Sequence, residues 1–163
     1  MKNIKLPFKK KDILKIIDFN PTPFHIYDEK AIIENARDLK KAFSWNEGFR
    51  EFFAVKANPN PFLIKLLKQE GFGCDCSSLP ELLISKMVGN IGEMIMFSSN
   101  NTPAIEFIKA RELGATINLD DISHIAFLEK NAGLPELLSF RYNPGSLKKG
   151  NDIIGKPEDA KYG

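Results

Sequence analysis

A unit of strand, loop and helix recurs along residues 51–133, at a spacing of roughly twenty residues. Apolar alternation predicts strands over residues 51–57, 72–77, 93–99 and 115–119. Helical periodicity predicts helices over residues 61–71, 79–89, 102–114 and 121–133, ending near Gly71, Gly89, Gly114 and Gly133. A fifth strand is predicted over residues 136–145 and opens onto a polar loop. Such a repeat is typical of right-handed βαβ units, so we expect a parallel sheet.

Two architectures accept this repeat: the closed (β/α)8 barrel and the open doubly wound sheet. No G-x-G-x-x-G follows a strand and no G-x-x-x-x-G-K-[ST] occurs, so the usual phosphate-binding signatures of open sheets are absent from the sequence. We therefore expect an α/β fold of the (β/α)8 TIM-barrel type. A barrel of this kind takes about 250 residues. Because the chain has 163 residues and five predicted strands, we expect an incomplete, truncated barrel of about five βα units.

Two regions are predicted along the chain. Residues 1–47 form a helical and extended lead-in, and residues 48–163 form the N-terminal portion of the barrel. The lead-in contains a short predicted helix over residues 12–19 and an extended piece between prolines. Asp28 is placed to cap a second helix over residues 29–43. The apolar stripe of that helix consists of Ile32, Ala36, Leu39 and Phe43.

The composition argues against several classes of protein. With 43% hydrophobic residues, 27% charged residues and a net charge of +2, the chain is ordinary for a globular protein and suggests no nucleic-acid or membrane surface. It has no apolar run of about 18 residues and no signal-peptide core, so we expect a cytoplasmic protein. Cys74 and Cys76 are predicted to be small buried side chains in a reducing compartment. His25 and His124 lack the spacing of a metal or triad site, and no metal is predicted.

Lys56 ends the apolar run EFFAVKA and precedes an Asn-Pro-Asn-Pro turn. Strand alternation places Phe52, Ala54 and Lys56 on one face, and both faces are expected to be buried. A buried ammonium must be paired or neutralised. Two interpretations stay open. The amine lies at the rim of the strand and reaches water, or it is a partly desolvated nucleophile that forms an imine.

Polar residues follow every predicted strand, at the edge that forms the active face of a barrel. Asp75 lies within an apolar strand and is either half of a buried ion pair or a member of a site. Arg141 carries a fork of donors that suits an anionic oxygen or a carboxylate. Ser78 and Glu81 fit a capping box, which competes with a catalytic role. The other polar residues of these loops are Asn58, Asn60, Ser77, Ser98, Ser99, Asn100, Asn101, Asn118, Asp120, Asp121 and Asn143. Of these, Asp120 and Asp121 suit helix N-caps, as does Thr102.

One family resemblance covers nearly the whole chain. It is carried, in this order, by PTPFHIYD, FFAVKANPNP, GFGCDCSSLPEL, MFSSNNTP, INLDD, FRYNPG and DAKYG. These segments resemble the diaminopimelate decarboxylases, which are pyridoxal 5'-phosphate (PLP) enzymes built on an alanine-racemase-like barrel. The resemblance implies conversion of meso-diaminopimelate into L-lysine and carbon dioxide. The pattern AVKAN followed by G-x-D-x-x-S-x-x-E also occurs in ornithine and arginine decarboxylases. Decarboxylation or racemisation of another basic amino acid, and a non-catalytic binding or structural protein, therefore stay open as alternatives.

The same resemblance implies roles for five residues. Lys56 matches the catalytic lysine that forms the internal aldimine with PLP. Asp75, Ser78 and Glu81 match the D-x-x-S-x-x-E segment, whose carboxylates lie near the cofactor. Arg141 matches the arginine of the fifth strand, which lies near the phenolic oxygen of the cofactor.

Other family features differ from this chain or lie beyond it. The family has Gly-Asn and then Lys after the third strand, whereas this chain has SSNNTP, so the resemblance assigns no role to Asn100 or Asn101. A histidine that stacks on the cofactor, a Gly-rich phosphate loop, a glutamate paired with the pyridine nitrogen and a C-terminal β domain follow the KYG segment in the family. The resemblance thus implies a homodimer when full length and a fragment that is inactive alone.

Overall fold

The structure is a computed structural model that describes residues 7–150 and 155–160. The chain divides into two compact units, Met1–Ala42 and Phe43–Gly163. The boundary predicted between a lead-in of residues 1–47 and a barrel portion of residues 48–163 stays a prediction. No helix within the described ranges is both long and apolar enough to cross a membrane.

The first unit contains two helices, α1 (Lys10–Phe19) and α2 (Glu29–Ala42). The start of α1 is stabilised by the side chain of Asp12, which accepts a hydrogen bond from the backbone N–H of Lys9 at 3.0 Å. Asp28 caps α2 as predicted, because its Oδ1 accepts from the N–H of Ala31 at 3.0 Å. The start of α2 is therefore confirmed, whereas α1 begins at Lys10, two residues before the predicted start at residue 12.

The second unit alternates strands and helices. The strands are β1 (Phe52–Ala54), β2 (Gly73–Cys76), β3 (Ile95–Ser99), β4 (Thr116–Leu119) and β5 (Leu138–Phe140). The helices are α3 (Pro61–Gln69), α4 (Leu79–Met87), α5 (Ala104–Glu112) and α6 (His124–Ala132). Short 3₁₀ turns cover Val55–Ala57, Gly92–Met94, Gly145–Leu147 and Pro157–Asp159. The four glycines predicted to end helices α3 to α6 all have a positive φ, which fits the left-handed residue that commonly ends a helix.

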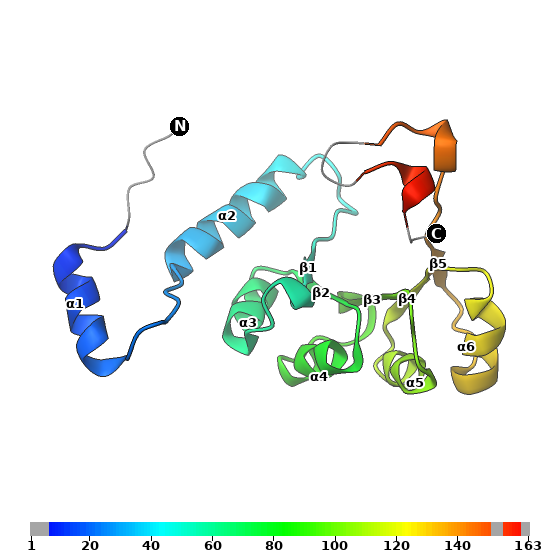
Figure 1. The fold of residues 1–163 in the computed structure, drawn as a ribbon, viewed down its shortest axis with the longest axis horizontal. Coiled ribbons are helices and arrows are strands. Elements are labelled where there is room, and N and C mark those ends of the chain that lie inside the picture. Colours follow the sequence, from blue (N-terminus) through cyan, green and yellow to red (C-terminus); the bar gives the residue numbers. More distant parts are fainter. Residues whose placement is uncertain (1–6, 151–154, 161–163) are drawn as a thin grey trace. The chain divides into compact units, whose positions relative to one another are not determined.

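The five strands are parallel and lie in the order β1-β2-β3-β4-β5. Helices α3 to α6 all lie along one face of this sheet (Figure 1). A doubly wound sheet would reverse its strand order and carry helices on both faces. The observed sequential order with helices on a single face is the arrangement of a (β/α)8 barrel, of which these strands are five. The predicted barrel type and its incompleteness are therefore confirmed.

The helix-facing side of the sheet is the hydrophobic core. Side chains of alternate strand residues point to this side and pack against the helices. Deeply buried members include Cys74, Cys76, Ile95, Phe97 and Ile117 from the strands, and Ile64, Leu82, Phe107 and Leu128 from the helices. The two cysteines are fully buried and unpaired, as the packing interpretation predicts. Burial raises the pKa of the Cys76 thiol, which favours the neutral form of that side chain.

The opposite side of the sheet is the face that lines the interior of a barrel. One row across it pairs Ala54 with Asp75 and Asp75 with Met96. The next row pairs Ser98 with Asn118 and Asn118 with Ser139. Near the start of β2, Gly73 lies opposite Phe52, and a Cβ on Gly73 would be 2.6 Å from the Phe52 ring and 2.7 Å from the carbonyl oxygen of Met94. Glycine at this position lets the aromatic ring lie across the strand.

The first strand is shorter than the sequence predicted. β1 ends at Ala54, and Val55–Ala57 form a 3₁₀ turn that is closed by a hydrogen bond from the N–H of Asn58 to the carbonyl oxygen of Val55 (3.2 Å). Lys56 therefore does not lie on a buried strand face, and its side chain is exposed. The reason is local, because the Asn-Pro-Asn-Pro segment turns the chain toward α3 before the strand can continue.

Candidate functional site

The predicted site residues come from the carboxyl ends of β1, β2 and β5. Lys56 lies in the turn after β1, and Asp75 lies near the end of β2. Ser78 is the N-cap of α4, Glu81 lies in the first turn of that helix, and Arg141 directly follows β5. Parallel strands bring their carboxyl ends to one edge of the sheet, which is the active face of a barrel. All five residues therefore belong to the same edge.

The carboxyl of Asp75 interacts electrostatically with three of the other predicted site residues, Lys56, Glu81 and Arg141. Burial raises the pKa of its carboxyl above the ordinary value, and the negative charge of Glu81 raises it further. The positive charges of Lys56 and Arg141 act in the opposite direction, and Lys56 is the stronger of the two. Charges shift a pKa in this way only at short range, so the structure brings Lys56, Glu81 and Arg141 within electrostatic reach of Asp75.

Lys56 is presented by a turn whose geometry is fixed by asparagines. The Oδ1 atom of Asn58 accepts a hydrogen bond from the N–H of Asn60 at 3.3 Å. Asn60 is in turn the N-cap of α3, and its Oδ1 accepts from the N–H of Phe62 at 3.0 Å. The prediction that these asparagines form turns before proline is confirmed. The exposed amine of Lys56 is thus accessible to a small molecule at the edge of the sheet.

Ser78 and Glu81 do not form the predicted capping box. The carboxylate of Glu81 accepts from the backbone N–H of Ser77 at 2.9 Å, instead of that of Ser78, and from the hydroxyl of Ser78 at 2.9 Å. The Ser78 hydroxyl is committed to this carboxylate, and it makes no bond to the amides of α4. The N–H of Leu79 is satisfied instead by Glu106 of α5, whose Oε1 lies 2.9 Å away. Glu81 is therefore held by two serines at the end of β2.

Arg141 is bound by the ends of β3 and β4. Its Nη1 donates to Oδ1 of Asp120 at 2.6 Å, and its Nη2 donates to the hydroxyl oxygen of Ser98 at 3.0 Å. The Nδ2 atom of Asn118 donates to the same Ser98 oxygen at 2.9 Å, and the hydroxyl of Ser139 donates to Oδ1 of Asn118 at 2.8 Å. The predicted carboxylate partner of Arg141 is therefore Asp120. We call these five residues the arginine network.

Three predicted helix caps are corrected by this geometry. Asp120 binds Arg141 instead of capping α6, whose N-cap is Ser123. Asp121 accepts from the N–H of Ser123 at 2.7 Å, so it stabilises the turn before α6 without being the N-cap itself. Thr102 precedes the N-cap of α5, and its hydroxyl donates to the carbonyl oxygen of Ser99 at 3.2 Å. Cap residues alone could not decide these cases, because Asp121 and Thr102 also have backbone partners within three residues, while the partner of Asp120 lies 21 residues away.

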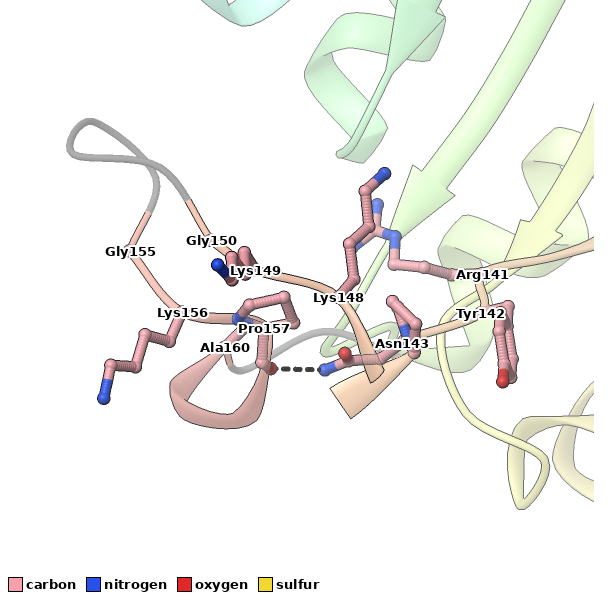
Figure 2. Close-up of a pocket in the computed structure, with 11 residues that line it drawn as sticks. Arg141, Tyr142, Asn143, Lys148, Lys149, Gly150, Gly155, Lys156, Pro157 and Ala160 are labelled. Carbon is pink, nitrogen blue, oxygen red and sulfur yellow. Dashed lines mark hydrogen bonds between the residues drawn. The ribbon is translucent and has the colours of Figure 1, made fainter. Parts of the chain in front are cut away.

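A pocket of about 280 Å³ lies beside the arginine network, after β5 (Figure 2). Its lining includes Arg141, Asn143, Lys148, Lys149 and Lys156. The side chain of Asn143 donates to the carbonyl oxygen of Pro157 at 2.8 Å, which joins the two segments that form the pocket (Figure 2). Four cationic side chains around one cavity favour an anionic group there. Within the described residues, no group of three potential metal ligands is found.

Other polar residues of the strand ends have no place in this arrangement. Asn100 and Asn101 are exposed in the loop between β3 and α5. The sequence had placed Ser98, Asn118 and Asp120 in the polar row at the strand ends, but it did not indicate that they bind Arg141. The signal that could have identified the network is the register of the parallel strands, which aligns Ser98 with Asn118 and Asn118 with Ser139.

The family model described as "Pyridoxal-dependent decarboxylase, pyridoxal binding domain" matches residues 29–163. The chain belongs to this family. Protein TabA of Pseudomonas amygdali pv. tabaci is 41% identical over 143 residues, which cover 88% of this chain and 33% of TabA. A diaminopimelate decarboxylase of Methanothermobacter thermautotrophicus is 35% identical over 134 residues, which cover 82% of this chain and 31% of that protein. The chain thus spans about a third of the length of these curated relatives.

Solved structures of family members share the fold. The diaminopimelate decarboxylase from M. jannaschii in co-complex with L-lysine matches with a TM-score of 0.74 at 30% identity, over 81% of this chain and 32% of that chain. The lysine decarboxylase from Selenomonas ruminantium in complex with PLP and cadaverine matches with a TM-score of 0.69 at 26% identity, over 80% of this chain and 33% of that chain. The predicted resemblance to PLP-dependent decarboxylases is therefore confirmed at the level of the family.

Proposed function

We propose that the protein containing this chain is a PLP-dependent decarboxylase that converts meso-diaminopimelate into L-lysine and carbon dioxide. The Methanothermobacter relative and the M. jannaschii complex with L-lysine, the product of that reaction, support this substrate. The observation that carries the proposal is the position of Lys56. It is an exposed primary amine at the carboxyl end of β1, within electrostatic reach of Asp75, in a chain of the pyridoxal-binding family.

The donor set at this edge of the sheet fits PLP. The aldehyde of the cofactor requires a primary amine that it can reach, and Lys56 offers one. The cofactor also carries anionic oxygens, which suit the guanidinium of Arg141. In the proposal Lys56 holds the cofactor covalently through Nζ, while Asp75 and Arg141 lie around it. Bound PLP supplies an electron sink for the electron pair that remains when carbon dioxide leaves.

Asp75 is suited to exchange a proton with Lys56. An amine must lose its proton before it can act as a nucleophile. The ammonium of Lys56 favours the ionised form of Asp75, whereas burial and Glu81 favour the protonated form. A carboxyl with a raised pKa, within electrostatic reach of Lys56, can accept the proton that the amine releases and return it later.

Glu81 has a positioning role in this proposal. Its carboxylate is held by the backbone N–H of Ser77 and by the hydroxyls of Ser77 and Ser78 at 2.9 to 3.3 Å. The negative charge therefore has a fixed place at the end of β2, and it contributes to the raised pKa of Asp75. Ser78 acts through Glu81 and has no direct contact with the cofactor in the proposal.

Borohydride reduction of the full-length protein loaded with PLP tests the role of Lys56. We expect a pyridoxyl adduct on the peptide that contains Lys56, detected by mass spectrometry, because reduction makes the covalent link permanent. The variant Lys56→Ala should give no adduct. The variant Lys65→Arg removes an exposed lysine of α3 and should keep the adduct. An adduct on a different lysine of the wild-type protein would contradict the assignment.

The substrate is decided by measuring carbon dioxide release from meso-diaminopimelate, L-lysine, L-ornithine and L-arginine. The match to a lysine decarboxylase favours a second candidate function, the decarboxylation of another basic amino acid. Preference for lysine, ornithine or arginine would support that candidate. A protein that releases no carbon dioxide and forms no adduct would be a non-catalytic member of the family. The proposal includes a homodimer, as the resemblance implies, and a cytoplasmic location, as the sequence composition predicts.

A further inference from the structure

The guanidinium of Arg141 is held by protein groups from two neighbouring strands. Asp120 follows β4 and accepts from Nη1 at 2.6 Å, while Ser98 in β3 accepts from Nη2 at 3.0 Å. The backbone N–H of Arg141 donates to the carbonyl oxygen of Leu119 at 2.9 Å, so the start of the side chain is fixed as well. A planar group that is bound at both terminal nitrogens has a defined orientation.

The partners of Arg141 are themselves fixed. The side chain of Asp120 is 9% exposed, whereas that of Arg141 is 31% exposed. Ser98 accepts a second hydrogen bond from Asn118, which in turn accepts one from Ser139. The more buried residues of the network therefore hold the more exposed one. A network in which each member is hydrogen-bonded resists reorientation when a ligand binds.

The charge of Asp120 also limits what Arg141 can do. A carboxylate at 2.6 Å offsets much of the positive charge of the guanidinium. Arg141 still lowers the pKa of Asp75, although less than Lys56 does. Arg141 is thus suited to donate hydrogen bonds in a fixed direction, and it is less suited to serve as the main counter-ion of a doubly charged phosphate.

We propose that Asp120, assisted by Ser98, is a positioning residue that orients the guanidinium of Arg141 toward the bound cofactor. This inference rests on the proposed function, because it assumes that the ligand beside Arg141 is PLP. It goes beyond that function in assigning a role to two residues that do not touch the cofactor. The adjacent Asp121 provides a matched control, since it is exposed and its carboxylate accepts from the N–H of Ser123.

The test is a double-mutant cycle on the PLP dissociation constant of the full-length protein. We expect Asp120→Asn to weaken PLP binding about tenfold, the effect of losing one hydrogen bond to a charged group. Asp121→Asn should leave the constant unchanged. In the background of Arg141→Met, Asp120→Asn should have little further effect, because its action passes through the arginine. If Asp120→Asn weakens PLP binding equally in the wild type and in Arg141→Met, or does not weaken it in the wild type, the inference is overturned.

A second measurement needs no cofactor. Nitrogen-15 NMR of the ligand-free protein should resolve the separate Nη signals of a fixed guanidinium in the wild type and in Asp121→Asn. In Asp120→Asn the signals should average, since rotation is no longer held by the carboxylate. If Asp120→Asn does not fold, Ser98→Ala replaces it in both measurements and should weaken PLP binding in the same direction. Averaged Nη signals in the wild type would overturn the positioning role of Asp120. A wild-type protein that binds no PLP but shows resolved Nη signals would overturn the proposed function, while the orientation of Arg141 by Asp120 would still hold.

Discussion

The two faces of the five-stranded sheet differ in what holds them together. On the helix-facing side, residues such as Ile95, Phe97 and Ile117 are fully buried in apolar contacts. On the opposite side, Asp75 is a half-buried carboxyl, and the polar members of the arginine network hydrogen-bond to one another. Successive residues of one strand point to opposite faces, so each short strand contributes side chains to both. The first face supplies stability, and the second supplies the arrangement of charges.

The two faces of the sheet tolerate different kinds of substitution. Apolar packing is non-directional, and its contribution grows with the area removed from water. The polar face depends on direction, because a hydrogen bond that moves by one ångström is lost. Substitutions on the helix-facing side should therefore change stability most, while substitutions on the polar side should change binding and pH dependence.

The largest effect on stability is expected at Phe97. Its side chain is 1% exposed and lies edge-on to the ring of Phe107, with ring centroids 6.1 Å apart. Phe97→Ala should lower the free energy of unfolding by about 3–5 kcal/mol, because the cavity cannot be refilled. Urea denaturation of the full-length protein measures this loss. The control Phe62→Ala removes a side chain that is 85% exposed and should change stability little. Equal losses at both positions would contradict the view that burial against the helix-facing side of the sheet supplies the stability.

The helix-facing side could be predicted from the sequence because its signals are local. Alternation, N-caps such as Asn60 and terminal glycines such as Gly133 lie within a few residues of the elements that they define. The location of Lys56, Asp75 and Arg141 at one edge also followed from the sequence, since consecutive parallel strands place their carboxyl ends together.

The contacts on the polar side could not be predicted because their partners are distant in sequence. Arg141 lies 21 residues from Asp120 and 43 residues from Ser98, and Leu79 lies 27 residues from Glu106. Local rules instead favoured a capping box for Glu81 and a cap role for Asp120, both of which were wrong. Strand register decides such pairs, and a single sequence without its structure does not specify register to within one residue.

A smaller loss of stability is expected at Gly73, on the polar side. Gly73→Ala would place a Cβ 2.6 Å from the ring of Phe52 and 2.7 Å from the backbone oxygen of Met94. The ring can move, but the backbone oxygen cannot move freely, so we expect a loss of about 1–3 kcal/mol by denaturation. The control Gly48→Ala brings its Cβ no closer than 3.4 Å to another group and should be nearly neutral. If Gly73→Ala does not change the free energy of unfolding, the polar side of the sheet accommodates an added methyl group as easily as an exposed loop does.

The smallest effect concerns the pH dependence of stability, and it compares Asp75 with Asp121. In the folded protein the pKa of Asp75 is raised above the ordinary 3.8, chiefly through burial. Between the unfolded and the folded pKa, the Asp75 carboxyl therefore holds its proton more often in the folded protein than in the unfolded chain. The stability associated with Asp75 is therefore complete below the unfolded pKa and is lost as the pH rises through the folded pKa. Asp75→Asn should remove this loss. Unfolding curves of the full-length apoprotein at several pH values should therefore show the free energy of unfolding of the variant rising relative to that of the wild type as the pH increases.

Asp121 should show the opposite sign. Hydrogen bonds from the side chain and the N–H of Ser123 lower its pKa, so it contributes stability that is present above the unfolded pKa and is lost as the pH falls through the folded pKa. Asp121→Asn should therefore lose stability relative to the wild type as the pH rises toward the ordinary carboxyl pKa, a range that lies below the one in which Asp75→Asn gains stability. Parallel curves for the two variants would contradict the view that the barrel-facing side of the sheet holds Asp75 in a partly desolvated site, because a carboxylate in open solvent with a cationic neighbour would follow Asp121.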